Sequence, residues 1–192
     1  MDHRTLEKYV QKLKSSSYDR HIPNISLENA RAIQELIRAR KPYHILEIGT
    51  ANGYSTLQFA HALEADATIT TIESAWNAHC EAVEHCKNCK LKNIHAIWWD
   101  AKAVIPSLQD TYFDFIFIDG MKREYLTYLL LSLPKATPHA LFILDDVEKF
   151  QSKMGDLFEW LDEKHIPVTR IPTDPDDSIM LIEWSVIKNI IL

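Results

Sequence analysis

Short apolar segments alternate with longer amphipathic ones along most of the chain. Five segments are rich in β-branched, aromatic and aliphatic residues, as strands are, and they lie at His44–Ile48, Thr68–Ile72, Ile94–Trp98, Phe113–Ile118 and Ala140–Leu144. The stretches between them are long enough for helices, and these lie at Ser55–Leu63, Ala75–Lys90, Ala101–Leu108 and Arg123–Leu133. This alternation predicts βαβ units and a mostly parallel sheet that is buried on both faces.

The N-terminal part of the chain predicts two helices before the first strand. Apolar side chains recur at helical spacing from Leu6 to Leu13, and the run Ser15-Ser16-Ser17 then breaks the pattern. Ser26 is a suitable N-cap for a second helix, which Pro42 ends.

The C-terminal part predicts an edge of the sheet. A helix near Lys153–Glu163 precedes two short strands, Val168–Pro172 and Ser178–Glu183, which a turn-rich segment joins. Such a pair is typical of an antiparallel hairpin. No linker or repeat divides the chain, so we expect one domain: N-terminal helices over 1–41, a catalytic core over 42–184 and a tail over 185–192.

Composition places the chain among ordinary globular proteins. Of its 192 residues, 46% are hydrophobic and 25% are charged, and the net charge of −6 argues against a strongly basic nucleic-acid-binding protein. The first twenty residues carry charges throughout and contain no secretory signal, and apolar runs such as Leu129–Leu131 are too short to span a bilayer. We therefore expect a cytoplasmic protein.

Charge is unevenly distributed along the sequence. Residues 1–41 hold nine basic and five acidic residues, whereas the rest of the chain holds 12 and 22. The basic residues of the N-terminal part are Arg4, Lys8, Lys12, Lys14, Arg20, Arg31, Arg38, Arg40 and Lys41. They indicate either a basic contact face or a pair of solvated surface helices.

A glycine-containing turn follows the first predicted strand. Two of the four glycines, Gly49 and Gly53, lie where this strand stops and a helix begins. Glycine permits a positive φ and a close approach of backbone to a ligand, and open α/β sheets bind ligands at this edge. Glu73 follows the second strand, where its carboxylate can accept hydrogen bonds from both hydroxyls of a ribose. The alternative is a tight turn without a ligand, in which Glu73 only caps a helix.

The residues of this turn resemble a known site. Glu47-x-Gly49-x-x-x-Gly53 together with Glu73 resembles the S-adenosylmethionine (SAM) site of the Rossmann-like methyltransferases. The spacing lacks the third glycine of Gly-x-Gly-x-x-Gly, which disfavours an NAD-dependent dehydrogenase. The resemblance implies SAM contacts from Glu47, Gly49, Thr50, Gly53, Ser55, Glu73, Ser74, Asp100, Ala101 and Asp119.

A second motif narrows the resemblance. Asp119-x-x-Lys122 follows the fourth strand and Asp145-Asp146 follows the fifth, a pattern similar to the metal-dependent O-methyltransferases. That family includes catechol and caffeoyl-CoA O-methyltransferases and bacterial tRNA 5-hydroxyuridine methyltransferases. The resemblance covers about residues 25–184. It implies an α/β, Rossmann-like methyltransferase fold, with a seven-stranded, mostly parallel sheet, helices on both faces and an antiparallel last strand.

The resemblance further implies one Mg²⁺ or Mn²⁺ bound by Asp119, Asp145 and Asp146. Hard cations prefer oxygen ligands, and three clustered carboxylates would repel one another without a cation. A divalent cation also favours the deprotonated form of a hydroxyl acceptor. The family has asparagine where Asp146 stands. This carboxylate can still bind a cation, or it only caps the next segment in a site without metal or activity.

Lys122 stands where the resembling enzymes have the lysine that accepts the proton of the acceptor. This role requires a lowered pKa, which partial burial and a nearby cation promote. The alternative is a solvated lysine at the start of a helix, where the helix dipole disfavours a cation.

The cysteines and two tryptophans complete the set of candidates. Cys80, Cys86 and Cys89 lie near histidines, but a structural zinc needs a second pair of ligands, so we expect reduced cysteines on a helix. Trp98 and Trp99 precede the segment implied to contact adenine. We expect one of them in the core and the other at the edge of the cofactor.

The sequence leaves the methyl acceptor open. The net negative charge favours a small, catechol-like hydroxylated molecule. The basic N-terminal part keeps the hydroxylated wobble uridine of tRNA as an alternative, because a phosphate contact face needs converging cations. A third hypothesis is a SAM-binding protein without catalysis. We expect no membrane partner, and a homodimer stays open.

Overall fold

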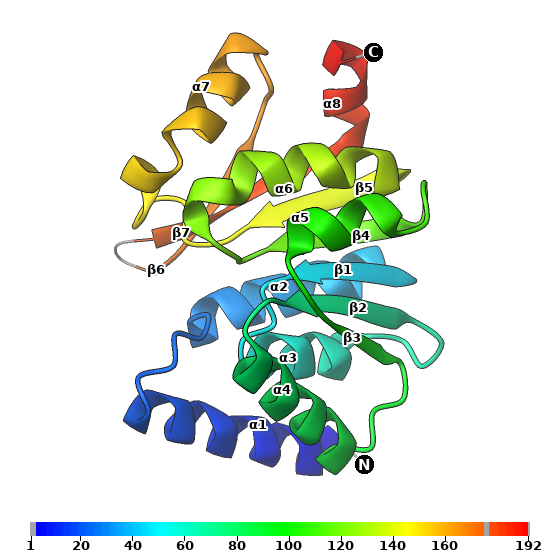
Figure 1. Ribbon diagram of the computed structural model, residues 1–192, viewed down its shortest axis with the longest axis vertical. Coiled ribbons are helices and arrows are strands. Elements are labelled where there is room, and N and C mark those ends of the chain that lie inside the picture. Colours follow the sequence, from blue (N-terminus) through cyan, green and yellow to red (C-terminus); the bar gives the residue numbers. More distant parts are fainter. Residues whose placement is uncertain (1–2, 175–176, 192) are drawn as a thin grey trace.

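The strands form one seven-stranded sheet in the order β3-β2-β1-β4-β5-β7-β6 (Figure 1). The computed structural model describes residues 3–174 and 177–191. The strands are β1 (His44–Ile48), β2 (Thr68–Glu73), β3 (Ile94–Trp98), β4 (Phe113–Ile118), β5 (Ala136–Leu144), β6 (Thr169–Asp174) and β7 (Asp177–Glu183). The pairs among β1 to β5 are parallel, and β7 is antiparallel to both β5 and β6. The predicted fold class and the antiparallel hairpin at the edge are confirmed.

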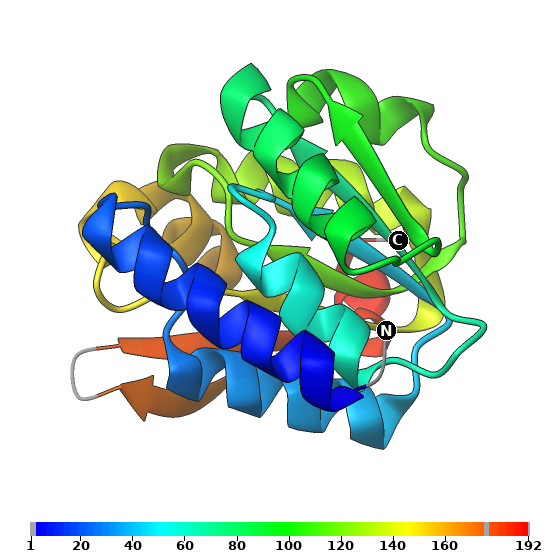
Figure 2. The same cartoon turned by 90° about the horizontal axis from the view of Figure 1, so that it is seen from below.

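Helices cover both faces of the sheet (Figures 1 and 2). They are α1 (His3–Asp19), α2 (Leu27–Arg40), α3 (Tyr54–Ala62), α4 (Trp76–Asn88), α5 (Ala101–Val104), α6 (Tyr125–Ser132), α7 (Gly155–Glu163) and α8 (Trp184–Ile191). Short 3₁₀ turns lie at η1 (Ile105–Ser107), η2 (Lys122–Glu124), η3 (Leu133–Lys135) and η4 (Gln151–Lys153). Figure 2 shows α1 lying across α3 on one face.

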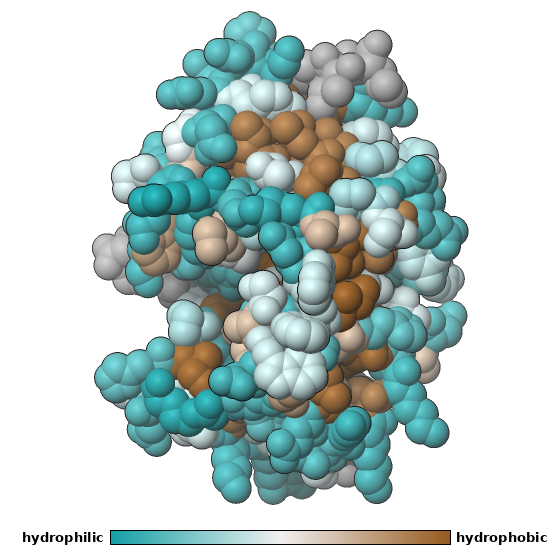
Figure 3. Space-filling model, viewed as in Figure 1, coloured by the Kyte–Doolittle hydropathy of each residue, from teal (hydrophilic) through white to brown (hydrophobic). Residues whose placement is uncertain are grey.

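The alternation of side chains along each strand divides the core into two clusters. On β4, Phe115 and Phe117 pack with α1, α2 and α3, whereas Ile116 and Ile118 pack with α6, α7 and α8. All four side chains are fully buried, as expected of a central parallel strand with helices on both faces. Figure 3 shows apolar side chains gathered on the surface over α6 and the base of α8.

The N-terminal helices match the prediction except at the serine run. Ser26 caps α2, because its side chain accepts a hydrogen bond of 2.9 Å from the Asn29 N–H. The predicted break at Ser15-Ser16-Ser17 is wrong, since α1 continues to Asp19. Ser17 Oγ donates to the Leu13 carbonyl at 2.7 Å and accepts from Asn52 Nδ2, so the hydroxyl is satisfied within the helix.

The end of the chain also adds an element. α8 covers most of the tail over 185–192, for which no element was predicted, and Ile187 is buried in the core. Within the described residues, no helix is both long enough and apolar enough to cross a membrane.

Candidate active site

A cavity of about 1160 Å³ lies at the carboxyl ends of the parallel strands. Backbone hydrogen bonds hold these ends in register: Asp119 N–H donates to the Ile48 carbonyl at 2.9 Å, and Asp145 N–H donates to the Ile118 carbonyl at 3.1 Å. The residues that follow β1, β4 and β5 are therefore brought to one edge of the sheet. This is the edge where open α/β sheets bind ligands.

Gly49 and Gly53 allow the turn after β1 to pack closely against the end of β4 and against α4. Both have positive φ angles, +101° and +86°. A Cβ on Gly49 would lie 2.3 Å from the carbonyl oxygen of Asp119, so glycine is needed for β1 and β4 to end side by side. A Cβ on Gly53 would lie 3.2 Å from Ala82 of α4. Gly49 lines the cavity, whereas Gly53 is not among its lining residues.

Glu47 lies behind the cavity wall. It is fully buried and accepts hydrogen bonds from Ser55 Oγ at 2.6 Å and Thr56 Oγ1 at 2.5 Å. Burial raises the pKa of Glu47 to about 7. Ser55 itself lines the cavity, so Glu47 holds the first turn of α3 in place and is not itself among the lining residues.

Glu73 lines the cavity at the end of β2. One oxygen accepts a hydrogen bond of 2.9 Å from the Ala51 N–H, and the other accepts one of 2.7 Å from the Ala75 N–H. The carboxylate therefore anchors the glycine-containing turn and the start of α4. Each oxygen of a carboxylate can accept a further bond, so this anchoring leaves acceptor capacity toward the cavity. The other lining residues among those predicted are Thr50, Ser74, Asp100, Ala101 and Asp119.

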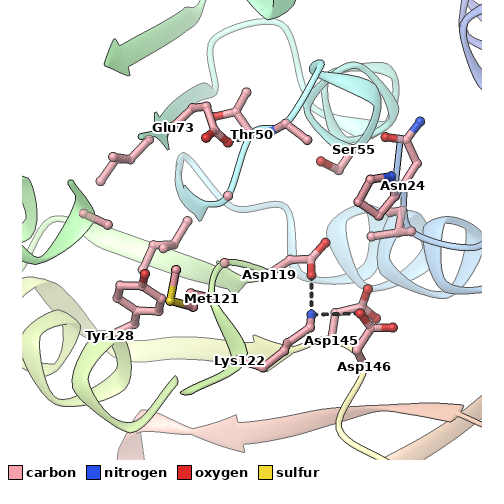
Figure 4. Close-up of a pocket in the computed structure, with 18 of the residues that line it drawn as sticks. Asn24, Thr50, Ser55, Glu73, Asp119, Met121, Lys122, Tyr128, Asp145 and Asp146 are labelled. Atoms are coloured by element: carbon pink, nitrogen blue, oxygen red, sulfur yellow. Dashed lines mark hydrogen bonds and ion pairs between the residues drawn. The ribbon is translucent and has the colours of Figure 1, made fainter. Parts of the chain in front are cut away.

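Asp119, Asp145 and Asp146 converge at one end of the cavity (Figure 4). Each offers a carboxylate oxygen, and these oxygens lie within 4.8 Å of one another. Asp146 has a φ of +58°, a conformation that asparagine and aspartate adopt more readily than most residues. Burial raises the pKa of Asp119 and of Asp145, whereas for Asp146 the Lys122 ammonium outweighs burial and lowers the pKa.

Lys122 lies among these carboxylates. Its ammonium is 2.7 Å from Asp119 Oδ1 and 2.8 Å from Asp146 Oδ2, and it donates a bond of 2.7 Å to the Tyr125 hydroxyl. Burial alone lowers the pKa of Lys122, but Asp119 and Asp146 outweigh burial and raise it. This differs from the lowered pKa that the sequence argument requires, because both carboxylates stabilise the charged ammonium.

Two residues of the site carry no signal in the sequence. Asn29 of α2 donates a hydrogen bond of 2.5 Å from Nδ2 to Asp145 Oδ1, and its Oδ1 accepts one from Thr173 of β6. Asp177, at the start of β7, lines the cavity and shares a hydrogen bond with Asp146. Both are far from the motif in sequence, so only the folded chain shows the contact.

The segment between α1 and α2 forms a further wall. Pro23, Asn24, Ile25 and Ser26 line the cavity, and Lys14 donates a bond of 2.6 Å to the Ile25 carbonyl. The N-terminal helices are thus part of the site's enclosure.

The tryptophans and cysteines are placed as follows. Trp98 and Trp99 are both exposed, which corrects the expectation that one is in the core, and Trp99 lines the cavity. Cys80, Cys86 and Cys89 are free thiols, as expected. Among the described residues, the aspartate cluster is the one group of three or more side chains placed to hold a metal ion.

Comparisons with known proteins agree with this class of fold. The O-methyltransferase TomG from Streptomyces achromogenes, solved in complex with SAM, superposes with a TM-score of 0.81 at 22% identity, covering 91% of this chain and 89% of that one. The O-methyltransferase from Bacillus cereus, solved in complex with SAH, gives a TM-score of 0.80 at 22% identity, covering 92% and 90%.

The sequence comparisons identify the family. The O-methyltransferase family model matches residues 2–147, so the chain belongs to this family. It is 28% identical over 128 residues to the catechol O-methyltransferase of Niastella koreensis, covering 65% of this chain and 58% of that protein. It is 27% identical over 133 residues to the flavonoid 3',5'-methyltransferase of Vitis vinifera, covering 63% and 57%. The chain thus spans less than three fifths of the length of these curated relatives.

Proposed function

We propose that this protein transfers the methyl group of SAM to a hydroxyl of a small catechol-like molecule, with the help of a divalent cation. The observation that carries the proposal is the convergence of three carboxylates and Lys122 in the same cavity as Glu73. The family and the SAM- and SAH-bound structural neighbours support the methyl donor, and the catechol O-methyltransferase relatives support the acceptor.

The cavity residues have separate roles in this proposal. Glu73 accepts hydrogen bonds from the ribose hydroxyls of SAM, and the other lining residues contact the rest of the molecule: Gly49, Thr50, Ser55, Ser74, Asp100, Ala101 and Asp119. Glu47 and Gly53 act from behind the wall, by fixing Ser55 and the start of α3. Residues 42–184 form the catalytic core.

The donor set fits Mg²⁺ or Mn²⁺. Asp119, Asp145 and Asp146 offer oxygen ligands, and because burial raises the pKa of Asp119 and of Asp145, a cation at this place would favour their ionised forms. When bound, a divalent cation supplies positive charge that favours the deprotonated acceptor hydroxyl and orients it.

Lys122 accepts the proton of the acceptor. The bond between sulfur and the methyl carbon breaks, a bond between oxygen and that carbon forms, SAH leaves, and the proton passes to the amine. The amine must first be neutral. Once the charge of Asp119 and Asp146 is compensated, burial is the influence that remains on the pKa of Lys122, and burial lowers it.

The N-terminal basic residues favour a small acceptor over tRNA. Arg20 pairs with Glu81, Arg40 with Glu183 and Lys41 with Glu64. Lys14 is bound to the carbonyl oxygens of the α1–α2 segment. Four of the nine cations are thus engaged within the chain. A phosphate contact face would have to be built from the others.

One experiment tests donor, metal and acceptor together. Radiolabelled SAM is offered with a panel of catechols and, separately, with bulk tRNA from a strain that lacks the endogenous activity, each with added Mg²⁺ or with excess chelator. We expect label in a catechol only, and only with the metal. Label in tRNA that Lys8→Glu and Lys12→Glu abolish would establish the tRNA alternative. SAM binding without any turnover would indicate the alternative of a SAM-binding protein without catalysis.

A homodimer and a cytoplasmic location also stay predictions.

A further inference from the structure

The end of the cavity away from the aspartate cluster holds two polar residues, Glu124 and Tyr128, that have no role in the proposed reaction. Trp99, Asp100 and Ala101 line the same end. Figure 4 shows Tyr128 on the same side of the cavity as Glu73, away from Asp145 and Asp146. This end is therefore separate from the carboxylates that surround Lys122.

Two hydrogen bonds hold the Glu124 carboxylate at this end. Lys102 Nζ lies 2.5 Å from Oε1, and the Tyr128 hydroxyl donates a bond of 2.5 Å to Oε2. Lys102 also lies 3.9 Å from Asp100 Oδ2, which places Glu124 beside the start of α5. The hydrogen bonds from Lys102 and Tyr128 lower the pKa of Glu124, so this side chain is ionised and can only accept hydrogen bonds.

The orientation of SAM follows from the proposed function, on which this step rests. The methyl carbon must reach an acceptor oxygen beside Lys122, so the sulfur lies toward the aspartate cluster. Glu73 receives the ribose. The adenine is attached to the ribose on the side remote from the sulfur, and it must then extend toward Trp99, Ala101, Glu124 and Tyr128.

We propose that Glu124 recognises the 6-amino group of adenine, by accepting a hydrogen bond from it while Lys102 and Tyr128 fix the carboxylate. The amine is a donor, and each carboxylate oxygen can accept a second bond. A purine that lacks the amine would leave this lone pair without a donor in the cavity. Glu124 thus determines the specificity for the base. Asp100 is the rival acceptor at this end, but its side chain is 53% exposed, whereas that of Glu124 is 23% exposed.

Two ligands and four variants test this assignment. The ligands are SAH and its 6-deamino analogue, in which hydrogen replaces the amino group. Their affinities are measured by calorimetric titration for the wild type, Glu124→Gln, Glu124→Ala, Asp100→Asn and Glu64→Gln. Glu64 is a surface residue paired with Lys41, so its variant makes the same charge change as Glu124→Gln away from the cavity. Melting curves show which variants are folded.

The ratio of the two affinities isolates the contact between Glu124 and the amine. We expect the wild type and Glu64→Gln to bind SAH about tenfold more tightly than the analogue, the value of one hydrogen bond to a charged group. In Glu124→Ala, which has no acceptor, the ratio should fall toward one, and in Glu124→Gln, whose uncharged amide oxygen accepts a weaker bond, it should fall between one and the wild-type value. A wild-type ratio of one, or an unchanged ratio in the folded Glu124 variants, would overturn the assignment, and a loss of the ratio in Asp100→Asn alone would transfer it to Asp100. Failure of the wild type to bind SAH at all would instead refute the proposed function.

Discussion

Asn29 of α2 donates a hydrogen bond of 2.5 Å to Asp145 at the end of β5, 116 residues further along the chain. Both ends of the amide are bonded, because its oxygen accepts from Thr173 of β6. Asn29 therefore links the N-terminal helices, the aspartate cluster and the edge hairpin. It orients one of the three carboxylates that would hold a cation.

Asn29→Ala should weaken metal binding more than it weakens SAM binding. Without the amide, the Asp145 carboxylate is no longer oriented, and such outer contacts change metal affinity by about 10–100-fold. Titration of activity with Mn²⁺ at saturating SAM measures the effect. Asn77→Ala, on the exposed surface of α4, is the matched control. An unchanged Mn²⁺ requirement in Asn29→Ala would mean that Asp145 needs no such support.

Lys122→Met should leave SAM binding intact and lower turnover. The methionine keeps an unbranched chain of nearly the same length but cannot accept a proton, and acid–base assistance contributes about 10²–10⁴-fold. Single-turnover rates with saturating SAM and metal measure the loss. Lys153→Met, on the exposed η4 turn, serves as the control. Wild-type turnover in Lys122→Met would remove this residue from the reaction.

Glu73→Ala should weaken SAM by about 1.5–3 kcal/mol, the value of hydrogen bonds to a charged group. The variant also loses the bonds from the Ala51 and Ala75 N–H groups, so part of its effect is on the turn itself. Glu73→Gln separates the two contributions, since a glutamine oxygen can still accept. Calorimetric titration of both variants makes the comparison. Equal affinity for SAM in Glu73→Ala and the wild type would place the ribose elsewhere.

The strands were predictable because each carries its signal locally. The segments predicted for β1, β3 and β4 agree with the structure residue for residue, since each is a short, largely apolar run between polar turns. The predicted helix break at the serine run was wrong because the Ser17 hydroxyl has two hydrogen-bond partners, one of which, Asn52, is 35 residues away. The helix α8 was not predicted, because a short apolar segment can pack as a helix or remain irregular, and contacts with the core decide.

The candidate site was predictable where its polar side chains come directly after a strand. Asp119, Asp145 and Asp146 are adjacent to apolar runs, so their convergence follows from the parallel sheet. The position of Glu47 behind the wall is not predictable from its motif, because the motif does not show which face of β1 the side chain takes. Asn29 and Asp177 were missed since their partners are remote in sequence.

Stability should show a pH dependence that originates in Glu47. Burial raises the pKa of Glu47 from 4.5 to about 7, so the folded state binds its proton more tightly than the unfolded state does. The resulting stabilisation is complete below about pH 4.5 and is lost as the pH rises through about 7. The shift corresponds to about 3 kcal/mol.

Glu47→Gln removes this titration while other groups are unchanged. Denaturant unfolding of both proteins between pH 4 and 8 should show that the wild type loses stability relative to the variant as the pH rises. Parallel curves would show that Glu47 keeps an ordinary pKa in the folded protein.

Two glycine substitutions should have opposite effects on stability. Gly49→Ala introduces a Cβ that would lie 2.3 Å from the Asp119 carbonyl oxygen, at a φ of +101° that alanine rarely adopts. The strand ends must then separate, at a cost of about 3 kcal/mol or more, and the cavity should bind SAM less tightly. Gly155→Ala is the matched control, because a Cβ there has no atom within 4 Å and the residue begins α7. That variant should be stabilised by about 0.4–1 kcal/mol, since alanine restricts the unfolded chain. Thermal and denaturant unfolding measure both changes, and comparable stability of the two variants would show that β1 and β4 do not require glycine at their junction.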